Sequence, residues 1–155
     1  MGKVHHYALS LEWMGNRGDG TTTYRGYDRD HVIRAEGKPD ILGSSDSAFL
    51  GSAERWNPEE LLLASIAACH KLWYLHLCTT KGIVVRAYSD RPTGMMIEET
   101  TGAGQFSEVT LNPSVTIAAG DPSVAESLHG QVGTLCFIAR SVNFPIRHSS
   151  KIIKV

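Results

Sequence analysis

One stretch constrains the fold of this chain more than any other: residues 56–78, which read WNPEELLLASIAACHKLWYLHLC. An apolar run of this length is typical of a helix rather than a strand. Its start carries helix signals, because Asn57 can cap, Pro58 suits the first helical position and the two glutamates that follow suit the positive end of the helix dipole. The sequence therefore predicts one long, mostly apolar helix with Cys69 in its middle.

Strand-like patterns lie on both sides of this helix. Residues 3–13 and 21–33 alternate in polarity, which predicts two half-buried strands before a long loop at 35–56. After the helix come three strand-like runs, a second helix and a last short strand, at 83–90, 94–100, 106–118, 120–142 and 149–155. Strands and helices in this order predict an α+β fold, and the length suits a single domain over residues 1–155.

Composition excludes several classes of protein. The net charge of -1 leaves no basic surplus, so a nucleic-acid partner is not expected. We see no signal peptide and no run of about 18 uncharged apolar residues, so no membrane segment is expected either. The chain has 3 cysteines, an odd number without the spacing of a disulfide scaffold. This pattern predicts a reducing compartment, and hence a cytoplasmic protein.

The cysteines differ in what they can reach. Cys69 and Cys78 are nine residues apart on one helix, which places them on opposite faces and roughly 13 Å apart along the axis. They cannot pair, because a disulfide needs Cα atoms within about 7 Å, and Cys78 is expected to be a core residue. Cys136 lies on a different element and can meet Cys69. Two interpretations remain open: a reversible disulfide, or two buried and inert thiols.

Glu59 raises a question of distance. It precedes Cys69 by ten residues, which is about 15 Å along a helix, so it cannot act on that thiol within one chain. If both serve one site, Glu59 must come from a second copy of the helix running antiparallel. The alternative is that Glu59 and Glu60 only complement the helix dipole. Small residues that allow two such helices to pack closely are Ala64, Ser65, Ala67 and Ala68.

Histidines and arginines supply the other candidates. His70 points about 100° away from Cys69 and is expected to be a hydrogen-bonded helix residue, whereas His129 shares a face with Cys136 and is a candidate for lining the site. Alternation in 21–33 places four side chains on one face, either solvated or close enough to a cysteine to stabilise a thiolate: Arg25, Tyr27, Arg29 and His31. No metal site is expected, because paired cysteines and an HExxH motif are absent from the sequence.

Two segments together resemble a known family. NPEELLLASIAACH at 57–70, followed by LHGQVGTLCFIARSVNFPI at 128–146, is similar to the OsmC/Ohr family of osmotically induced protein C and the organic hydroperoxide resistance proteins. The resemblance implies an OsmC-like α+β fold with antiparallel sheets around a long central helix. It also implies an intertwined homodimer with active sites at the dimer interface, in agreement with the distance argument for Glu59.

The chemistry implied by the resemblance is that of an antioxidant enzyme. Members are thiol-dependent peroxidases that reduce organic hydroperoxides to alcohols in the oxidative stress response. Cys69 matches the cysteine that becomes a sulfenic acid, and Cys136 matches the one that condenses with it to a disulfide. Glu59 matches the carboxylate that holds a catalytic arginine. No bound cofactor is implied, since an external dithiol such as a lipoylated protein reduces the disulfide.

The catalytic arginine is where this chain departs from the family pattern. In one branch that arginine lies in the first glycine-rich turn, which here offers Arg17. In another it lies in the loop before the helix, where residues 46–51 contain none. The predicted strand offers Arg29 and Arg25 instead, and we rank Arg29 first and Arg17 second. Alternative functions on the same scaffold are a non-catalytic thiol redox sensor, a small-molecule-binding protein or a structural domain with inert thiols.

Overall fold

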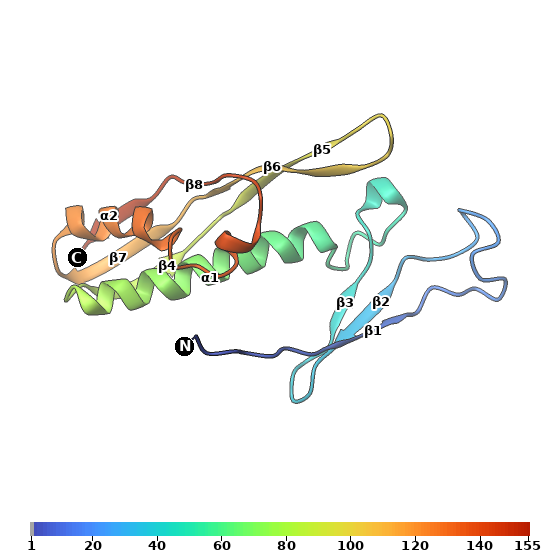
Figure 1. The fold of residues 1–155 in the computed structure, drawn as a ribbon, viewed down its shortest axis with the longest axis horizontal. Coiled ribbons are helices and arrows are strands. Elements are labelled where there is room, and N and C mark those ends of the chain that lie inside the picture. The colour runs from blue at the N-terminus through green and yellow to red at the C-terminus, as the bar shows by residue number, and fades with distance from the viewer. Residues whose placement is uncertain (1) are drawn as a thin grey trace. The chain divides into compact units, whose positions relative to one another are not determined.

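The computed structural model describes residues 2–155, which form an α+β fold with two α-helices (Figure 1). The chain divides into two compact units, one ending at Leu61 and the other comprising Leu62–Val155. The long helix α1, Pro58–Thr80, contributes its first turn to the first unit and the remainder to the second. The predicted fold class and the predicted long helix are therefore both confirmed.

The first unit is built on a three-stranded antiparallel sheet. Its strands β1 (Ser10–Trp13), β2 (His31–Arg34) and β3 (Ile41–Gly43) pair in sequence order, and a short 3₁₀ turn, Ser47–Phe49, follows. The strand predicted over 3–13 is thus shorter than expected. Its predicted half-buried face is wrong within this chain, since Tyr7 is 91 % exposed and Leu11 60 % exposed.

The strand predicted over residues 21–33 is also wrong, because residues 21–27 form turns and regular pairing begins only at His31. Local hydrogen bonds explain the difference. The side chain of Asn16 accepts from the backbone N–H groups of Gly18 and Gly20, and both glycines adopt positive φ angles of 125° and 59°. The alternating face proposed for Arg25, Tyr27, Arg29 and His31 therefore does not exist. The loop predicted at 35–56 contains β3 and the 3₁₀ turn.

The second unit contains two three-stranded sheets. One has the order β4 (Val84–Ser89), β7 (Ser114–Ala119), β9 (Lys151–Lys154), and the other β5 (Thr93–Glu98), β6 (Gly104–Leu111), β8 (Ile146–His148). The pairs β4–β7 and β5–β6 are antiparallel, whereas β6–β8 and β7–β9 are parallel. The expectation of purely antiparallel sheets is thus corrected. The parallel pairs arise because α2 and its following turn carry the chain back before β8 and β9 begin.

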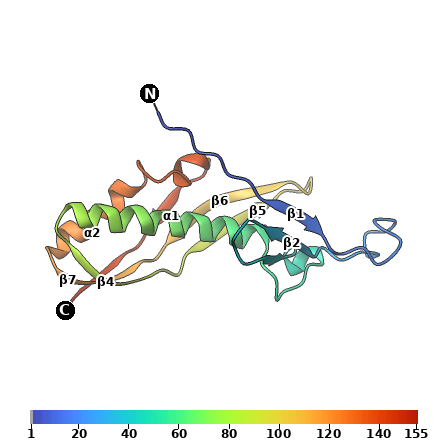
Figure 2. The ribbon, with the colours of Figure 1, turned by 90° about the horizontal axis from the view of Figure 1, so that it is seen from below.

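Two predicted boundaries moved for identifiable reasons. The run at 106–118 splits into β6 and β7, because Pro113 has no N–H to continue a ladder. The second helix, α2, covers only Pro122–Val132 of the predicted 120–142, and its Asp121 cap accepts from the N–H of Ser123 at 2.7 Å. Figures 1 and 2 show β6 and β7 following one another alongside α1.

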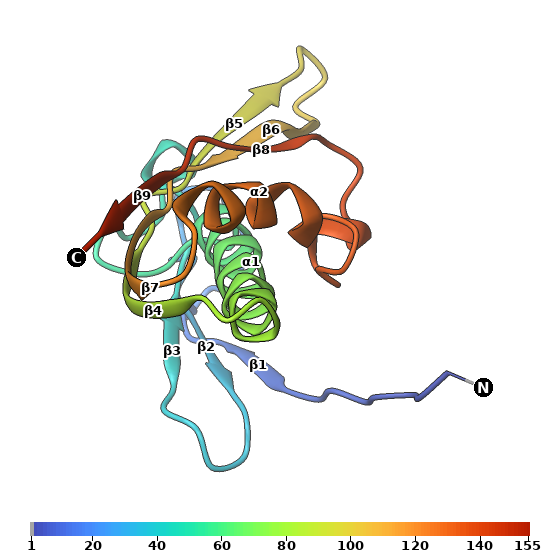
Figure 3. The ribbon, with the colours of Figure 1, turned by 90° about the vertical axis from the view of Figure 1, so that its left-hand side faces the viewer.

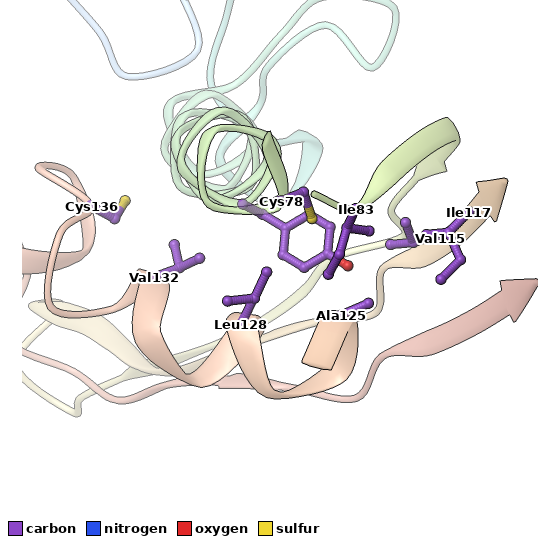
Figure 4. Packing of buried hydrophobic residues seen from close by; sticks show 9 residues of the cluster. Cys78, Ile83, Val115, Ile117, Ala125, Leu128, Val132 and Cys136 are labelled. Carbon is purple, nitrogen blue, oxygen red and sulfur yellow. The ribbon is translucent and has the colours of Figure 1, made fainter. Parts of the chain in front are cut away.

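The core of the second unit lies where α1 and α2 meet, as the end-on view in Figure 3 shows. Helix α1 buries residues spaced four apart: Ile66, His70, Tyr74 and Cys78. Tyr74 and Cys78 belong to a cluster with residues of α2 and β7 that includes Leu128, Val115 and Cys136 (Figure 4), whereas Ile66 packs with Val109 and Leu111 of β6. By length and composition alone α1 is also apolar enough to cross a membrane, which the sequence had not led us to expect. Its buried residues pack as those of a core helix do.

Candidate active site

Cys69 and Cys136 meet at the packed interface between α1 and the end of α2. Cys69 is half-buried on α1 and packs against the cluster that contains Cys136. Cys136 follows α2 in a turn held by its N–H bond to the carbonyl of Val132 at 2.8 Å, and it is 1 % exposed. Its sulfur accepts a hydrogen bond from the backbone N–H of Ala139 at 3.4 Å. The two thiols that the sequence left on separate elements are therefore neighbours.

The surroundings of Cys136 make its thiol a weak acid. Burial, and next the adjacent Cys69 thiol, raise the pKa of Cys136 to about 11. Its sulfur is therefore protonated at neutral pH. Cys78 is different, because it lies apart from Cys136 in the middle of the same cluster (Figure 4), and burial raises the pKa of its thiol without a second cysteine nearby. Cys78 thus has the position of a core residue.

Three histidines gather beside this thiol pair. His70 Nε2 on α1 lies 2.9 Å from His129 Nδ1 on α2, and the two rings are parallel within 5°. The ring of Tyr74 stacks on a face of the His129 ring at 3.9 Å between centroids. His148 at the end of β8 lies 5.7 Å from His129, centroid to centroid. His70 is thus a hydrogen-bonded helix residue, and His129 indeed lies close to the candidate site.

Burial keeps the two inner histidines uncharged. Desolvation lowers the pKa of His70 to about 4 and that of His129 to about 3, with charge repulsion from neighbouring histidines as the second cause. The Nε2 atom of His129 is buried and has no hydrogen-bond partner among residues 2–155. Within that same range no group of three or more side chains is arranged to hold a metal ion.

A cavity of about 130 Å³ opens beside Cys136. Its polar walls are the three histidines and Arg147, and its apolar walls include Ile66, Leu111, Val132 and Ile146. Gly130 and Gly133 of the α2 region border it, and a β-carbon added at either would meet no atom within 4 Å. Cys136 is among the lining residues and Cys69 is not. Only one cysteine of the pair therefore borders the cavity.

The two glutamates at the start of α1 have separate surroundings. Glu60 forms a capping box with Asn57: the Asn57 side chain accepts from the Glu60 N–H at 2.8 Å, and the Glu60 carboxylate accepts from the Asn57 N–H at 3.2 Å. Glu59 takes no part in this cap. Its Oε2 atom is buried without a hydrogen-bond partner in the described residues. Helix capping thus accounts for Glu60, whereas Glu59 is left with an unsatisfied oxygen.

The two arginines ranked from the sequence both have partners within the first unit. Arg17 is exposed and paired with Asp28, with Nε 3.0 Å from Oδ2, and this pairing lowers the pKa of the Asp28 carboxyl. Arg29 donates to the carbonyl oxygens of Tyr24 and Tyr27. Its guanidinium also lies over both tyrosine rings, at 4.5 and 4.1 Å from their centroids.

A further arginine, Arg55, was not among the candidates predicted from the sequence. Its Nε lies 3.0 Å from Asp30 Oδ2, and Ser52 donates to the other oxygen of that carboxylate at 2.7 Å. Its Nη1 atom is buried without a hydrogen-bond partner in residues 2–155. Its position in the sequence could have indicated it, because Arg55 lies in the loop before α1, four residues after the segment 46–51 that contains no arginine.

Comparison with known proteins identifies the family and the fold of this chain. Residues 51–151 match the family described as OsmC-like protein. The uncharacterized protein YmaD of Bacillus subtilis (strain 168) is 24 % identical over 142 residues, which are 89 % of this chain and 87 % of YmaD. A structure of an OsmC-like protein of unknown function from Vibrio cholerae superposes with a TM-score of 0.84 at 23 % identity, over 95 % of this chain and 99 % of that one.

A structure with a named function has the same fold. An organic hydroperoxide resistance protein from Elizabethkingia anophelis superposes with a TM-score of 0.67 at 14 % identity, over 97 % of this chain and 99 % of the other. The chain therefore belongs to the OsmC-like family, as its sequence motifs had indicated. Its α+β architecture is that of OsmC and organic hydroperoxide resistance proteins.

Proposed function

We propose that this protein is a thiol-dependent peroxidase that reduces organic hydroperoxides to alcohols. The observation that carries the proposal is the meeting of Cys69 on α1 with Cys136 beyond α2, in a fold shared with an organic hydroperoxide resistance protein. Two inert core thiols would have no chemical reason to lie next to each other. A protein whose thiols must be reduced after each turnover also needs a reducing compartment such as the cytoplasm.

The proposed cycle uses each cysteine once. The Cys69 thiolate attacks the terminal peroxide oxygen, the O–O bond breaks and the alcohol leaves, so Cys69 becomes a sulfenic acid. The Cys136 sulfur then displaces the hydroxyl group, which leaves as water with the thiol proton, and a Cys69–Cys136 disulfide forms. An external dithiol returns both sulfurs to thiols and supplies the two electrons. The cycle requires no bound cofactor.

We further propose that the protein works as a homodimer. Helix α1 exposes a stripe of residues spaced four apart, Ala64, Ala68, Leu72 and His76, and Leu72 is 62 % exposed. Strand β1 is exposed along its whole length. These surfaces are suited to burial against a second copy. In such a dimer an antiparallel α1 brings Glu59, with its unsatisfied oxygen, to the Cys69 of the other subunit.

The guanidinium of the site has three candidates within this proposal. Arg29 and Arg17 are the positions that the sequence favours, and each would have to exchange its present partners for Glu59. Arg55 needs no such exchange, because its buried Nη1 is free while its Nε holds Asp30. A cation beside Cys69 would favour the thiolate and orient the peroxide.

A steady-state assay of peroxide loss with cumene hydroperoxide and dihydrolipoamide tests the proposed function. We expect many turnovers per protein, each consuming one dithiol. A non-catalytic redox sensor on the same scaffold would consume one equivalent and stop. Absence of any thiol loss after one equivalent of peroxide would identify a structural domain with inert thiols and would overturn the proposal.

A further inference from the structure

The cavity of about 130 Å³ in the second unit has no role in the proposed cycle, although Cys136 borders it. Five of its lining residues are at most 1 % exposed: Ile66, Leu111, His129, Val132 and Cys136. Four others are exposed and form its rim: Gly130, Gly133, Arg147 and His148. The cavity therefore extends from the surface to the core, and a small molecule can enter it from the rim.

His129 gives this cavity an unsatisfied polar atom. Its Nδ1 lies 2.9 Å from Nε2 of His70, and the ring of Tyr74 stacks on it at 3.9 Å between centroids, so neighbours on two sides hold the imidazole in place. The other ring nitrogen, Nε2, is buried and has no hydrogen-bond partner among residues 2–155. A buried polar atom without a partner destabilises a fold. Because His129 lines the cavity, a molecule bound there can supply the partner.

We propose that this cavity binds a small neutral hydroxyl compound, a phenol or a cyclic alcohol, without forming a covalent bond. The hydroxyl group bonds to Nε2 of His129, and the hydrocarbon ring packs against the aliphatic walls of the cavity. The inference goes beyond the proposed function, because it assigns a second site whose occupation neither requires nor involves peroxide reduction.

The hydrogen bond between the two imidazoles selects a hydroxyl group. If His70 donates from Nε2 to Nδ1 of His129, then His129 carries its own proton on Nε2 and offers a donor to the cavity. If His129 donates from Nδ1 instead, its Nε2 is an acceptor. A hydroxyl group is both donor and acceptor, so it satisfies Nε2 in either tautomer, whereas a carbonyl or an ether satisfies it in only one.

The charges around the cavity disfavour an ionic ligand. The lining residues, all within 2–155, include no aspartate or glutamate, so a buried ammonium group would have no partner. A buried anion would need a cation beside it, but desolvation lowers the pKa of His129 to about 3, and this ring is neutral at pH 7. Arg147 lies at the exposed rim, where its Nε is 3.4 Å from Glu108 Oε2. A neutral compound therefore suits the buried end.

The size and the apolar walls of the cavity suit a single six-membered ring. Its volume of about 130 Å³ is close to that of an engineered protein cavity of about 150 Å³ that binds benzene. Four aliphatic side chains offer contacts to such a ring: Ile66, Leu111, Val132 and Ile146. One ring with one hydroxyl group thus matches the volume, the apolar walls and the single unpaired nitrogen.

Titration of the parent protein, followed by methyl NMR, tests the binding and its place. The probes are phenol and cyclohexanol, an aromatic and an aliphatic source of the hydroxyl group, with toluene as the analogue of phenol that lacks it. We expect at least one hydroxyl probe to bind about tenfold or more tightly than toluene, because toluene leaves Nε2 of His129 unpaired. The methyl signals of Ile66, Leu111 and Val132 should shift. Equal or weaker binding of both hydroxyl probes, or shifts confined to other methyl groups, would overturn the inference.

Removing the nitrogen tests the hydrogen bond itself. His129→Phe keeps an aromatic ring against Tyr74 but has no nitrogen, so the preference for the hydroxyl probe over toluene should disappear. His5→Phe, at an exposed position, is the control and should keep the preference. A preference that survives in His129→Phe would contradict the assignment. Should His129→Phe fail to fold, the ¹⁵N signal of His129 Nε2 in the labelled parent protein decides. It should shift with the hydroxyl probe and not with toluene, and a signal that neither probe moves would overturn the inference.

Discussion

The Nε2 atom of His70 lies 2.9 Å from Nδ1 of His129, so two buried imidazoles from different helices share a hydrogen bond in the core of the second unit. Only one proton can occupy the space between these nitrogens. Burial, and next charge repulsion from neighbouring histidines, keeps both rings neutral well below the pH at which an exposed histidine titrates.

Acid should therefore unfold the second unit. An unfolded histidine has a pKa of about 6.5, whereas burial lowers the folded values to about 4 for His70 and about 3 for His129. Between these limits the unfolded chain binds more protons, so the free energy of unfolding falls as the pH falls from about 6.5, by at most about 1.4 kcal/mol per pH unit for each histidine. Urea unfolding from pH 7 to pH 4.5 measures this slope. His129→Gln should flatten it, and His5→Gln, at an exposed position outside the proposed dimer surface, should not.

Replacing either cysteine of the proposed cycle should impair it in a different way. Cys69→Ser should abolish peroxide reduction, because a hydroxyl at neutral pH does not replace a thiolate. Cys136→Ser should still consume about one equivalent of peroxide and then stop as a sulfenic acid, or over-oxidise in excess peroxide. Single-turnover stopped flow with a sulfenic-acid trap distinguishes them. Opposite behaviour would reverse the roles, and two mutants indistinguishable from the parent would end the peroxidase hypothesis.

Substitution of the two adjacent glutamates should distinguish a role in activity from a role in helix capping. Glu59→Gln should slow peroxide reduction by about tenfold or more, since the proposed carboxylate partner of the arginine is lost. Glu60→Gln should change little, because glutamine can also complete a capping box with Asn57. Peroxide kinetics on both variants make the comparison. Equal activity of Glu59→Gln and the parent would show that Glu59 serves only the helix end.

Removing the charge of each candidate arginine tests whether one of them stabilises the Cys69 thiolate. We expect that one of Arg55→Gln, Arg29→Gln and Arg17→Gln raises the pH at which Cys69 reacts with iodoacetamide, because loss of an adjacent cation raises the pKa of a thiol. Arg34→Gln is the control, since Arg34 is exposed and paired with Glu12 and Asp40. Should all four variants alkylate like the parent, no guanidinium stabilises the Cys69 thiolate.

The proposed dimer should depend on the exposed face of α1. Replacing Leu72 by glutamate puts a charge in the middle of the exposed stripe, so Leu72→Glu should weaken the dimer and, with it, peroxide reduction. Light scattering at micromolar concentration measures the molecular mass. Gln131→Glu, at an exposed position of α2, is a control with the same change in charge. A parent protein that is a folded monomer under these conditions would rule out the shared site.

The sequence predicted those parts of the fold that local chemistry determines. Helix α1 was found with its start, because a capping asparagine and Pro58 specify it. The strand over 21–33 failed because side-chain and glycine turns, such as that of Asn16 with Gly18, compete with alternation. Strand β8 was missed altogether. It has three residues, and its pairing to β6 depends on a chain reversal through α2 that no short pattern encodes.

In the candidate site, too, local spacing was predictable from the sequence and contacts between distant elements were not. Helical spacing showed that Cys69 cannot reach Cys78, but it could not decide whether Cys136 approaches Cys69, because that contact depends on how α1 packs on α2. The histidine cluster needs three separate elements, and His148 arrives there through the parallel register of β8 beside Leu111. Arg55 was overlooked although its position in the sequence was visible, since only its buried Nη1 distinguishes it from a surface arginine.

The parallel pairing of β8 and β9 has a consequence for the order of events during synthesis. Both strands dock onto β6 and β7 from more than thirty residues further along the chain, so their contacts form late. Until residues 146–154 arrive, the wall that carries Ile146 and His148 is missing, although both cysteines have already been made. A nascent chain would therefore carry Cys136 before the chamber that this cysteine lines is complete, so in the proposed cycle an ordered Cys69–Cys136 disulfide has to wait for the last strands.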